Sequence, residues 1–341
     1  MRACHLSEDT MISRREALTG AIAGALAVPF LPRLADAQGA AQIRISTAAP
    51  PSDFLAKALE QLKAEVDAAN AGLNVSVHVA STLFKQGTEV PALQRGNLEM
   101  STMTTFEVAQ QIPELGYFNR GYLFKDHAHL RRVFDGPIGE SYRAIVAEKM
   151  GIEILATHYL GTRQVNLRQK RAVKGPADLA GVKLRMPAGP EWLLLGRTLG
   201  VSPVPMGMPE VYLAMKTGTI DGQENPLSIL NAAKLHEVSE QVVMTSHMLQ
   251  PVLFSIAKPV WDKLNADQKK LLKAAAIKAA KWGDGARLAD EASIIDALKG
   301  RGLAVDVIDL APFREAANKA YDGAEATKAW DLAGLKRIQD A

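Results

Sequence analysis

Between positions 43 and 102 the apolar residues repeat at two spacings in turn, and this alternation constrains the fold more than any other feature. Residues 43–45 and 73–79 are apolar at every second position, which is typical of strands, whereas residues 55–66 are apolar at helical spacing. A short helix over residues 89–95 and a strand over residues 98–102 follow. Strands that alternate with helices form parallel sheets covered by helices, so the pattern predicts an α/β fold.

The alternation resumes further along the chain and indicates a second lobe. Residues 128–150 predict a helix, residues 152–156 and 182–186 predict strands, and residues 191–199 predict another helix. A capping-box pattern at residues 265–268 then begins a long alanine-rich helix, which we expect to pack on both lobes.

The carboxyl ends of the predicted strands indicate where a ligand binds. In open α/β sheets, ligands bind in the crevice beyond these ends. In the first lobe the corresponding loops follow Thr47, Val79 and Met103, so we expect ligand-binding residues in these loops.

The N-terminal residues resemble an export signal. A twin arginine at residues 14–15 precedes a mostly apolar, uncharged run at residues 19–31 and the sequence Ala-Asp-Ala at residues 35–37. The apolar run is short and is interrupted by glycine and proline, which favours a cleaved signal over a retained membrane anchor. We therefore interpret residues 1–37 as a twin-arginine-type signal peptide and expect a periplasmic protein, with Met11 as an alternative start of translation.

Composition excludes several kinds of site and partner. The only cysteine of the 341 residues is Cys4, so a chain processed after residue 37 has no disulfide and no thiol-based catalytic or metal site. The 40 Lys and Arg residues nearly balance the 37 Asp and Glu residues, for a net charge of +3. No basic stripe interleaved with aromatic residues is present, so we expect no nucleic-acid partner.

The sequence lacks the common catalytic and nucleotide-binding motifs. It contains no G-x-S-x-G, no H-E-x-x-H, no P-loop and no G-x-G-x-x-G between a strand and a helix. His127 and His129 have no third ligand at metal-binding spacing, so we interpret them as a solvated helix start. We expect neither a metal nor a cofactor.

Two arginines are candidate ligand-binding groups. Arg185 lies on the strand at residues 182–186, which Pro187 ends at once, and its planar guanidinium suits bidentate binding of a carboxylate. Arg163 follows the strand at residues 152–156 in a similar position. Each arginine taken alone is more often a surface or ion-paired residue, whereas two arginines at one cleft favour an anionic ligand.

An unusual polar run, Gln223, Glu224 and Asn225, follows a helix that ends at Gly218 and a short strand predicted at residues 219–221. We expect the Asn225 amide to donate to a carboxylate oxygen of the ligand. We interpret Gln223 and Glu224 as caps of neighbouring backbone groups.

Three motifs together resemble the substrate-binding proteins of tripartite ATP-independent periplasmic (TRAP) transporters, which deliver organic acids to a sodium-driven membrane permease. The motifs are D-L-A-G-V-K-L-R-M-P at residues 178–187, V-P-M followed by E-V-Y within residues 204–212, and D-G-Q-E-N-P at residues 221–226. The resemblance covers nearly all of the chain after the signal, from residue 43 to about residue 313.

The resemblance implies a ligand site. Arg185 matches the arginine that binds the substrate carboxylate in this family, and Arg163 matches a second contact of its sialic-acid-binding branch. Asn225 matches the asparagine that completes the clamp, and His247 matches a histidine of the polar pocket network. The rest of the pocket is expected to be lined by Met208, Gln86, Thr47 and Thr104.

Three positions differ from the sialic-acid-binding branch. Thr104 replaces a glutamate, Met208 replaces an aromatic residue, and Ala188 replaces an asparagine. These changes remove polar partners of a large sugar acid, so we expect a different acid that is smaller or less hydroxylated.

The resemblance implies a two-lobed periplasmic binding protein fold, type II-like, with mixed sheets flanked by helices and one long helix spanning both lobes. We assign residues 38–160 and about 251–290 to lobe I, and residues 161–250 and about 291–341 to lobe II. We expect a monomer that closes around its ligand by a hinge motion and that has TRAP permease subunits as partners.

Two other classes of function stay open at this point. One is an exported α/β enzyme that acts on an organic acid with His247 or His158 as general base, although no nucleophile and base occur at a recognisable spacing. The other is a structural scaffold of the cell envelope, which leaves the paired arginines unexplained. Recovery of unchanged ligand after long incubation distinguishes a receptor from an enzyme.

Overall fold

The computed structural model describes residues 40–341. The interpreted signal peptide, Cys4 and Met11 lie outside these residues. In the described part no helix is both long and apolar enough to cross a membrane. Residues 40–341 also contain no group of three or more His, Cys, Asp or Glu side chains placed to bind a metal.

The strands of the described residues belong to one mixed sheet. They are β1 (Ala41–Ser46), β2 (Leu73–His78), β3 (Met100–Thr104), β4 (Ile152–Leu167), β5 (Lys183–Met186), β6 (Ser202–Pro205), β7 (Gly222–Pro226), β8 (Gln241–Ala257) and β9 (Ala304–Val307). Their order is β2-β1-β3-β8-β4-β7-β5-β6, with β9 beside β8. β1 is parallel to β2 and β3, and β5 is parallel to β6 and β7, whereas the long strands β4 and β8 are antiparallel and join the two groups.

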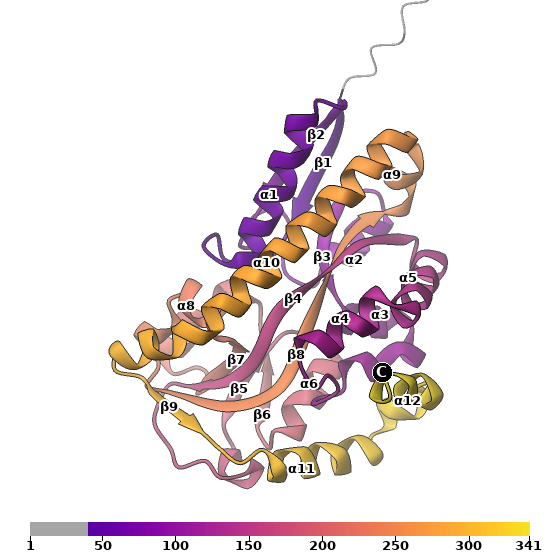
Figure 1. Cartoon of the computed structure of the whole chain (residues 1–341). Coiled ribbons are helices and arrows are strands. Elements are labelled where there is room, and N and C mark those ends of the chain that lie inside the picture. The colour runs from indigo at the N-terminus through magenta and orange to yellow at the C-terminus, as the bar shows by residue number, and fades with distance from the viewer. Residues whose placement is uncertain (1–39) are drawn as a thin grey trace, which may run out of the picture. The chain divides into compact units, whose positions relative to one another are not determined.

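Helices cover both groups of strands (Figure 1). They are α1 (Phe54–Ala69), α2 (Glu89–Gln94), α3 (Thr105–Gln111), α4 (His127–Asp135), α5 (Pro137–Met150), α6 (Pro190–Thr198), α7 (Val211–Thr217), α8 (Leu227–Ala232), α9 (Lys258–Lys263), α10 (Ala266–Gly300), α11 (Ala311–Asp322) and α12 (Leu332–Gln339). Short 3-10 helices include Pro113–Asn119 and Met208–Glu210.

The long strands β4 and β8 cross from one half of the sheet to the other. β3 pairs with residues 252–256 of β8, whereas β7 pairs with residues 163–167 of β4. The pairing of β4 with β8 shifts in register between Tyr159 and Gly161. Gly161 has a φ of 120°, and a Cβ atom there would lie 2.7 Å from the Cβ of Pro226. Glycine is therefore required where the chain passes between the halves.

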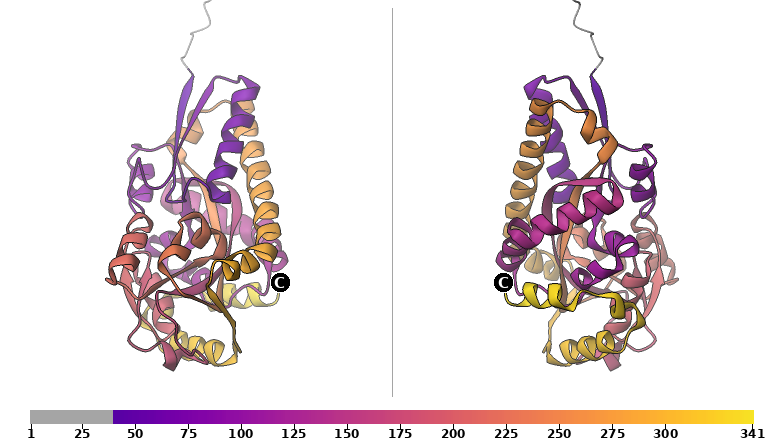
Figure 2. Two further views of the ribbon diagram at one scale, coloured as in Figure 1. Left: turned by 90° about the vertical axis from the view of Figure 1, so that its left-hand side faces the viewer. Right: turned by 90° about the vertical axis from the view of Figure 1, so that its right-hand side faces the viewer.

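The long helix α10 links the two halves along one side. Figure 1 shows it running from α9 across β4 towards β9, and both views of Figure 2 place it beside α1. Its N-terminus has the predicted capping box: Asn265 Oδ1 accepts from the Gln268 amide at 2.9 Å, and Gln268 Oε1 accepts from the Asn265 amide at 3.1 Å. The buried stripe of this helix includes Leu272, Ala275, Ala276, Ala279 and Ala280.

Three local predictions from sequence were wrong. The helix predicted at residues 128–150 is two helices, because Gly136 ends α4 and Pro137 begins α5. The strand predicted at residues 152–156 continues to the end of β4, and the strand predicted at residues 219–221 begins only at Gly222.

The histidine pair at the start of α4 is not solvated as predicted. His129 is fully buried, with Nε2 2.8 Å from the carbonyl of Ile338. His127 is partly buried, with Nε2 3.1 Å from a carboxylate oxygen of Asp284 on α10. Both rings therefore hold helices together.

Candidate functional site

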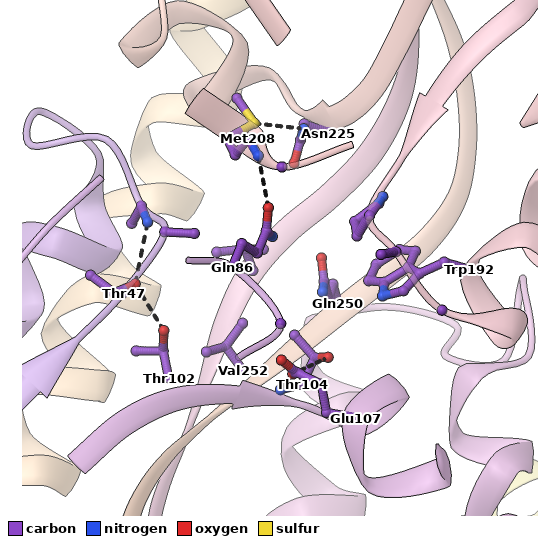
Figure 3. Close-up of a pocket in the computed structure, with 18 of the residues that line it drawn as sticks. Thr47, Gln86, Thr102, Thr104, Glu107, Trp192, Met208, Asn225, Gln250 and Val252 are labelled. Atoms are coloured by element: carbon purple, nitrogen blue, oxygen red, sulfur yellow. Dashed lines mark hydrogen bonds between the residues drawn. The ribbon is translucent and has the colours of Figure 1, made fainter. Parts of the chain in front are cut away.

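A cavity of about 440 Å³ is lined by residues from both halves of the sheet (Figure 3). Its volume lies in the range of small-molecule sites in proteins. Every side chain predicted for the site lines it except His247: Thr47, Gln86, Thr104, Arg163, Arg185, Met208 and Asn225.

Arg185, the third residue of β5, is 1% exposed. Its Nε donates to the Met206 carbonyl at 2.8 Å, its Nη2 donates to Gln86 Oε1 at 3.0 Å, and its Nη1 lies 3.9 Å from the Met208 sulfur. These partners are uncharged. Burial lowers the pKa of Arg185 to about 9, against a smaller opposing effect of Glu224, so the guanidinium stays protonated at neutral pH. The cavity wall thus holds a buried cation that has no ion-pair partner among residues 40–341.

Arg163 lies within β4, not after the end of a strand as predicted, and is 2% exposed. Its guanidinium forms a bidentate ion pair with Glu224 and also donates to the Glu224 carbonyl at 2.7 Å. It donates to Gln250 Oε1 as well, and its Cζ lies 5.0 Å from the centre of the Trp192 ring. Burial favours a raised pKa for Glu224, but Arg163 and His247 outweigh it and lower that pKa to about 2. The positive charge of Arg163 is therefore neutralised within the protein, by the carboxylate of Glu224.

His247 contacts Glu224 and is not among the residues that line the cavity, so it belongs to the polar network behind the cavity wall. Its Nε2 lies 3.0 Å from Glu224 Oε2, and its Nδ1 lies 2.8 Å from Thr245 Oγ1. Burial lowers the pKa of His247, so the imidazole is neutral at neutral pH. Because a carboxylate only accepts, Nε2 carries the proton and Nδ1 accepts from the Thr245 hydroxyl. His247 therefore positions Glu224, which in turn holds Arg163.

The polar run at residues 223–225 forms the centre of β7, and its three side chains have different roles. Glu224 is the buried partner of Arg163, so its interpretation as a backbone cap was wrong. Gln223 does not cap the backbone either: its Nε2 lies 3.3 Å from Asn166 Oδ1, and its Oε1 accepts from Asn225 Nδ2 at 2.7 Å. Asn225 itself lines the cavity.

The lining residues that were missed from sequence include Glu89, Glu107, Trp192 and Gln250. Trp192, on α6, stacks on Phe106 of α3 with ring centres 3.5 Å apart and an angle of 7° between the planes. Because α3 follows β3 and α6 follows β5, this stack joins the two halves of the sheet. It closes one end of the cavity with an aromatic wall.

Gln86 makes a second contact across the cavity. It comes from the segment between β2 and α2, and its Oε1 accepts from Arg185 Nη2 at 3.0 Å and from the Met208 amide at 2.8 Å. Figure 3 shows Gln86 reaching towards Met208 and Asn225, with Thr104 and Glu107 on the opposite side of the cavity. The two halves of the sheet are therefore held together over the cavity by an amide oxygen.

Neither histidine suggested as a general base lines the cavity. His158 is fully buried, with Nδ1 2.9 Å from Asp284 on α10, and the ring of His247 contacts Glu224. A base must come within hydrogen-bond reach of the proton that it removes, directly or through a water. Their positions therefore do not support the enzyme alternative.

Comparisons with known proteins agree with this geometry. The sequence model of the DctP family, described as bacterial extracellular solute-binding protein, family 7, matches residues 45–328. A solute-binding protein of Verminephrobacter eiseniae is 33% identical over 309 residues, which cover 90% of each chain. The sialic acid-binding periplasmic protein SiaP of Vibrio cholerae is 30% identical over 249 residues, which cover 73% of this chain and 77% of SiaP.

A solved structure is similar over the same region. It is a TRAP periplasmic solute-binding protein from Roseobacter denitrificans with bound 3-deoxy-D-manno-oct-2-ulosonic acid, 36% identical, with a TM-score of 0.85 over 88% of this chain and 99% of that chain. The predicted two-lobed α/β binding-protein fold is thereby confirmed. The chain therefore belongs to family 7 of the bacterial extracellular solute-binding proteins, the DctP family, and is a substrate-binding protein of the TRAP transporter type.

Proposed function

We propose that this protein is a periplasmic receptor that binds a small organic acid in the cavity between its lobes and delivers it to a TRAP membrane permease. One observation carries the proposal: Arg185 is a buried, protonated guanidinium without an anionic partner in the described part of the chain. A buried charge is costly unless it is paired. A ligand carboxylate supplies the missing partner, and Asn225 donates to the same carboxylate.

The ligands of two relatives support this class of substrate. Sialic acid, in the name of SiaP, and 3-deoxy-D-manno-oct-2-ulosonic acid, bound in the Roseobacter protein, are both carboxylic acids. Arg163 does not bind the carboxylate as a free cation here, since Glu224 occupies its fork. It forms a rigid wall of the cavity instead, together with Gln86, Met208, Thr47 and Thr104.

The architecture supports a proposal for how the receptor closes. Lobe I comprises residues 38–160 and about 251–290, and lobe II comprises residues 161–250 and about 291–341. The lobes move about the crossing of β4 and β8.

We propose that residues 1–37 direct export through the twin-arginine route and that the mature protein is a monomer. Sedimentation of the mature protein with and without ligand tests the last point.

A thermal-shift panel followed by calorimetry tests the receptor function. Small acids should include at least one that raises the melting temperature, whereas neutral sugars and cationic amines should give no shift. With the best acid, Arg185→Ala should cost about 2 to 5 kcal/mol of binding free energy, because the ligand carboxylate is then buried without its partner. Arg185→Lys should also weaken binding, since an ammonium lacks the planar fork.

Arg197→Ala is the matched control. Arg197 is an exposed arginine in the last turn of α6 and does not line the cavity, so its loss should leave affinity unchanged. Affinity of Arg185→Ala within about threefold of the wild type, or a strong shift with a neutral sugar and none with any acid, would reject the proposal.

A further inference from the structure

A second recess lies at the end of β4, β5 and β7 that points away from the cavity, and the proposed function does not use it. Its volume is about 300 Å³. It is formed by the segment that follows β4, the turn before β5 and the residue before β7. β4 passes Arg163 in the cavity wall and ends four residues later at Leu167 in the recess, which is about 13 Å of strand. The recess is therefore a site of its own.

Three cationic side chains line this recess, against a single carboxylate. The cations are Arg168, Lys170 and Arg171, and the carboxylate is Asp221. Within residues 40–341, none of the three cations forms an ion pair. One oxygen of Asp221 accepts from the Lys183 amide at 2.9 Å. The lining of the recess thus has two positive charges in excess.

The neighbouring sequence does not supply the missing negative charge. Residues 168–183 contain five basic residues and one acidic residue, Asp178. Asp178 Oδ2 accepts from the Lys174 amide at 2.8 Å, and Glu240 Oε2 accepts from the Lys170 amide at 3.2 Å. Both carboxylates therefore bind backbone groups, and neither lines the recess.

Arg168 is the cation whose hydrogen-bonding groups are least satisfied. Its Nε is sealed from solvent without an acceptor, and its guanidinium donates no hydrogen bond within the described part of the chain. The side chain lies against the end of α7, because a Cβ atom at Gly218 would be 3.5 Å from its Cζ and from its Nη2. Buried polar groups in proteins nearly always have a partner, and an unpaired charge raises the cost further. An anion on this guanidinium lowers that cost.

The backbone that carries the three cations is held in place by the protein. The Arg168 amide donates to the Asp221 carbonyl at 2.8 Å. The Arg171 amide donates to Gln241 Oε1 at 3.0 Å, and Gln241 Nε2 donates to the Arg171 carbonyl at 2.8 Å. Arg171 Nη1 also donates to the Asp178 carbonyl at 3.0 Å. Because the segment is ordered before an anion arrives, binding has a smaller entropic cost.

We propose that this recess binds a doubly charged oxyanion, a phosphate group, through the guanidinium of Arg168 and the charges of Lys170 and Arg171. The volume lies at the lower end of small-molecule sites and suits a small ion. The excess of two positive charges matches a dianion. A guanidinium forms two parallel hydrogen bonds with phosphate oxygens, which favours this ligand over a spherical anion such as chloride. The site does not depend on the proposed function, since no cavity residue takes part.

Two-dimensional NMR of the full mature protein tests the site at pH 8, where phosphate carries two charges. Sodium phosphate and glycerol 3-phosphate are titrated separately, with sodium chloride at equal ionic strength as the control. The amide signals of residues 168–171 and Gly181 should shift with both phosphates and not with chloride. The same shifts should occur in Arg185→Met, which lacks the proposed anchor of the cavity. Phosphate-dependent shifts that are confined to cavity residues would overturn the proposal.

Side-chain variants identify the groups that bind. Arg168→Gln should weaken phosphate binding at least about tenfold, because it removes the charged fork. Lys170→Gln and Arg171→Gln should each weaken it less. Arg95→Gln is the matched control, since Arg95 is an exposed arginine at the end of α2 that lines neither the recess nor the cavity. Its phosphate affinity should equal that of the wild type. Melting temperatures verify that each variant is folded.

The outcomes decide between a phosphate site and a solvated basic surface. Shifts of equal size with sodium chloride, or wild-type phosphate affinity in Arg168→Gln, would overturn the proposal. Tighter binding of phosphate than of glycerol 3-phosphate would assign the recess to the free ion, and the reverse would assign it to a phosphomonoester; both results uphold an oxyanion site. Failure of the proposal leaves the receptor function intact, because binding of organic acids is measured separately at the cavity.

Discussion

At the scale of single residues, the two cavity arginines differ in how the protein compensates their charge. Arg163 has Glu224 as a bidentate partner, and His247 holds that partner in place. Arg185 has only the Met206 carbonyl, Gln86 and a sulfur. The first arginine thus has its counter-charge within the protein, whereas the second has none among the described residues, and for that reason we propose Arg185 as the ligand anchor.

Because only Arg163 has a carboxylate partner, replacing each of the two arginines should change the stability of the unliganded protein in opposite directions. Arg163→Ala should destabilise the unliganded protein by about 3 to 5 kcal/mol, because it leaves Glu224 buried without its partner. Arg185→Met should stabilise the unliganded protein, by on the order of 1 to 4 kcal/mol, while it abolishes binding. Urea denaturation without ligand measures both changes. Destabilisation of equal size in the two variants would show that Arg185 is already compensated.

Glu89 predicts a pH dependence of stability. Its pKa is about 7 in the folded protein and 4.5 when unperturbed, so the folded state binds more protons between these values. The free energy of unfolding contributed by this group therefore falls as pH rises from about 4.5 to about 7, by about 3 kcal/mol in total. Glu89→Gln should lose this dependence. Denaturation at pH 5 and pH 8 should show the variant gaining stability relative to the wild type at the higher pH, and a constant difference would contradict the assignment.

The residues found from sequence are those whose role follows from local position. Arg185 could be predicted because Pro187 ends its strand at a defined point, which places the guanidinium near the carboxyl end of β5. Glu107 was missed because a glutamate three residues after Thr104 is typical of a helix cap, and it does cap α3 while it also lines the cavity. The contact of His247 with Glu224 could not be predicted from sequence, because only tertiary packing decides which groups surround a buried histidine.

At the scale of elements, the crossing of β4 and β8 could not be predicted from sequence. The alternation of apolar residues predicted the parallel groups around β1 and β5, since both faces of such strands are buried. β4 is buried along nearly its whole length. The spacing of its apolar residues therefore does not indicate where the strand passes from one half of the sheet to the other. Gly161 marks that point, through the 2.7 Å approach of its Cβ position to Pro226.

Two glycine substitutions test this role of Gly161. Gly161→Ala should destabilise the protein by about 1 to 3 kcal/mol, because its φ of 120° and the contact with Pro226 both oppose a side chain. Gly285→Ala, in the exposed interior of α10 with no atom near its Cβ position, should stabilise by about 0.4 to 1 kcal/mol. Thermal denaturation of both variants measures these changes in stability. An unchanged stability of Gly161→Ala would show that the backbone at the crossing is not strained.

At the scale of the described molecule, the two halves of the sheet are joined in different ways on the two sides of the cavity. On the side of α10, Arg287 is fully buried and donates to Asp53 Oδ1 at 2.8 Å and to the Ser228 hydroxyl. Asp53 caps α1 and Ser228 lies on α8, so this arginine joins elements of both halves. Across the cavity, Gln86 is one hydrogen-bonded contact, and it accepts from groups of the second half.

This asymmetry predicts a hinge at the crossing of β4 and β8, on the side of α10, and an opening at Gln86, and small-angle scattering measures this opening. Ligand should reduce the radius of gyration of the wild type, because its contacts with both halves favour the closed state. The reduction should be absent in Arg185→Ala at ligand concentrations that saturate the wild type, and present in Arg197→Ala. Without ligand, Gln86→Ala should have a larger radius than the wild type, because the loss of its oxygen frees the Arg185 and Met208 donors that hold the halves together. Profiles that coincide for all variants, with and without ligand, would show a rigid cavity, and ligand would then enter without movement of the lobes.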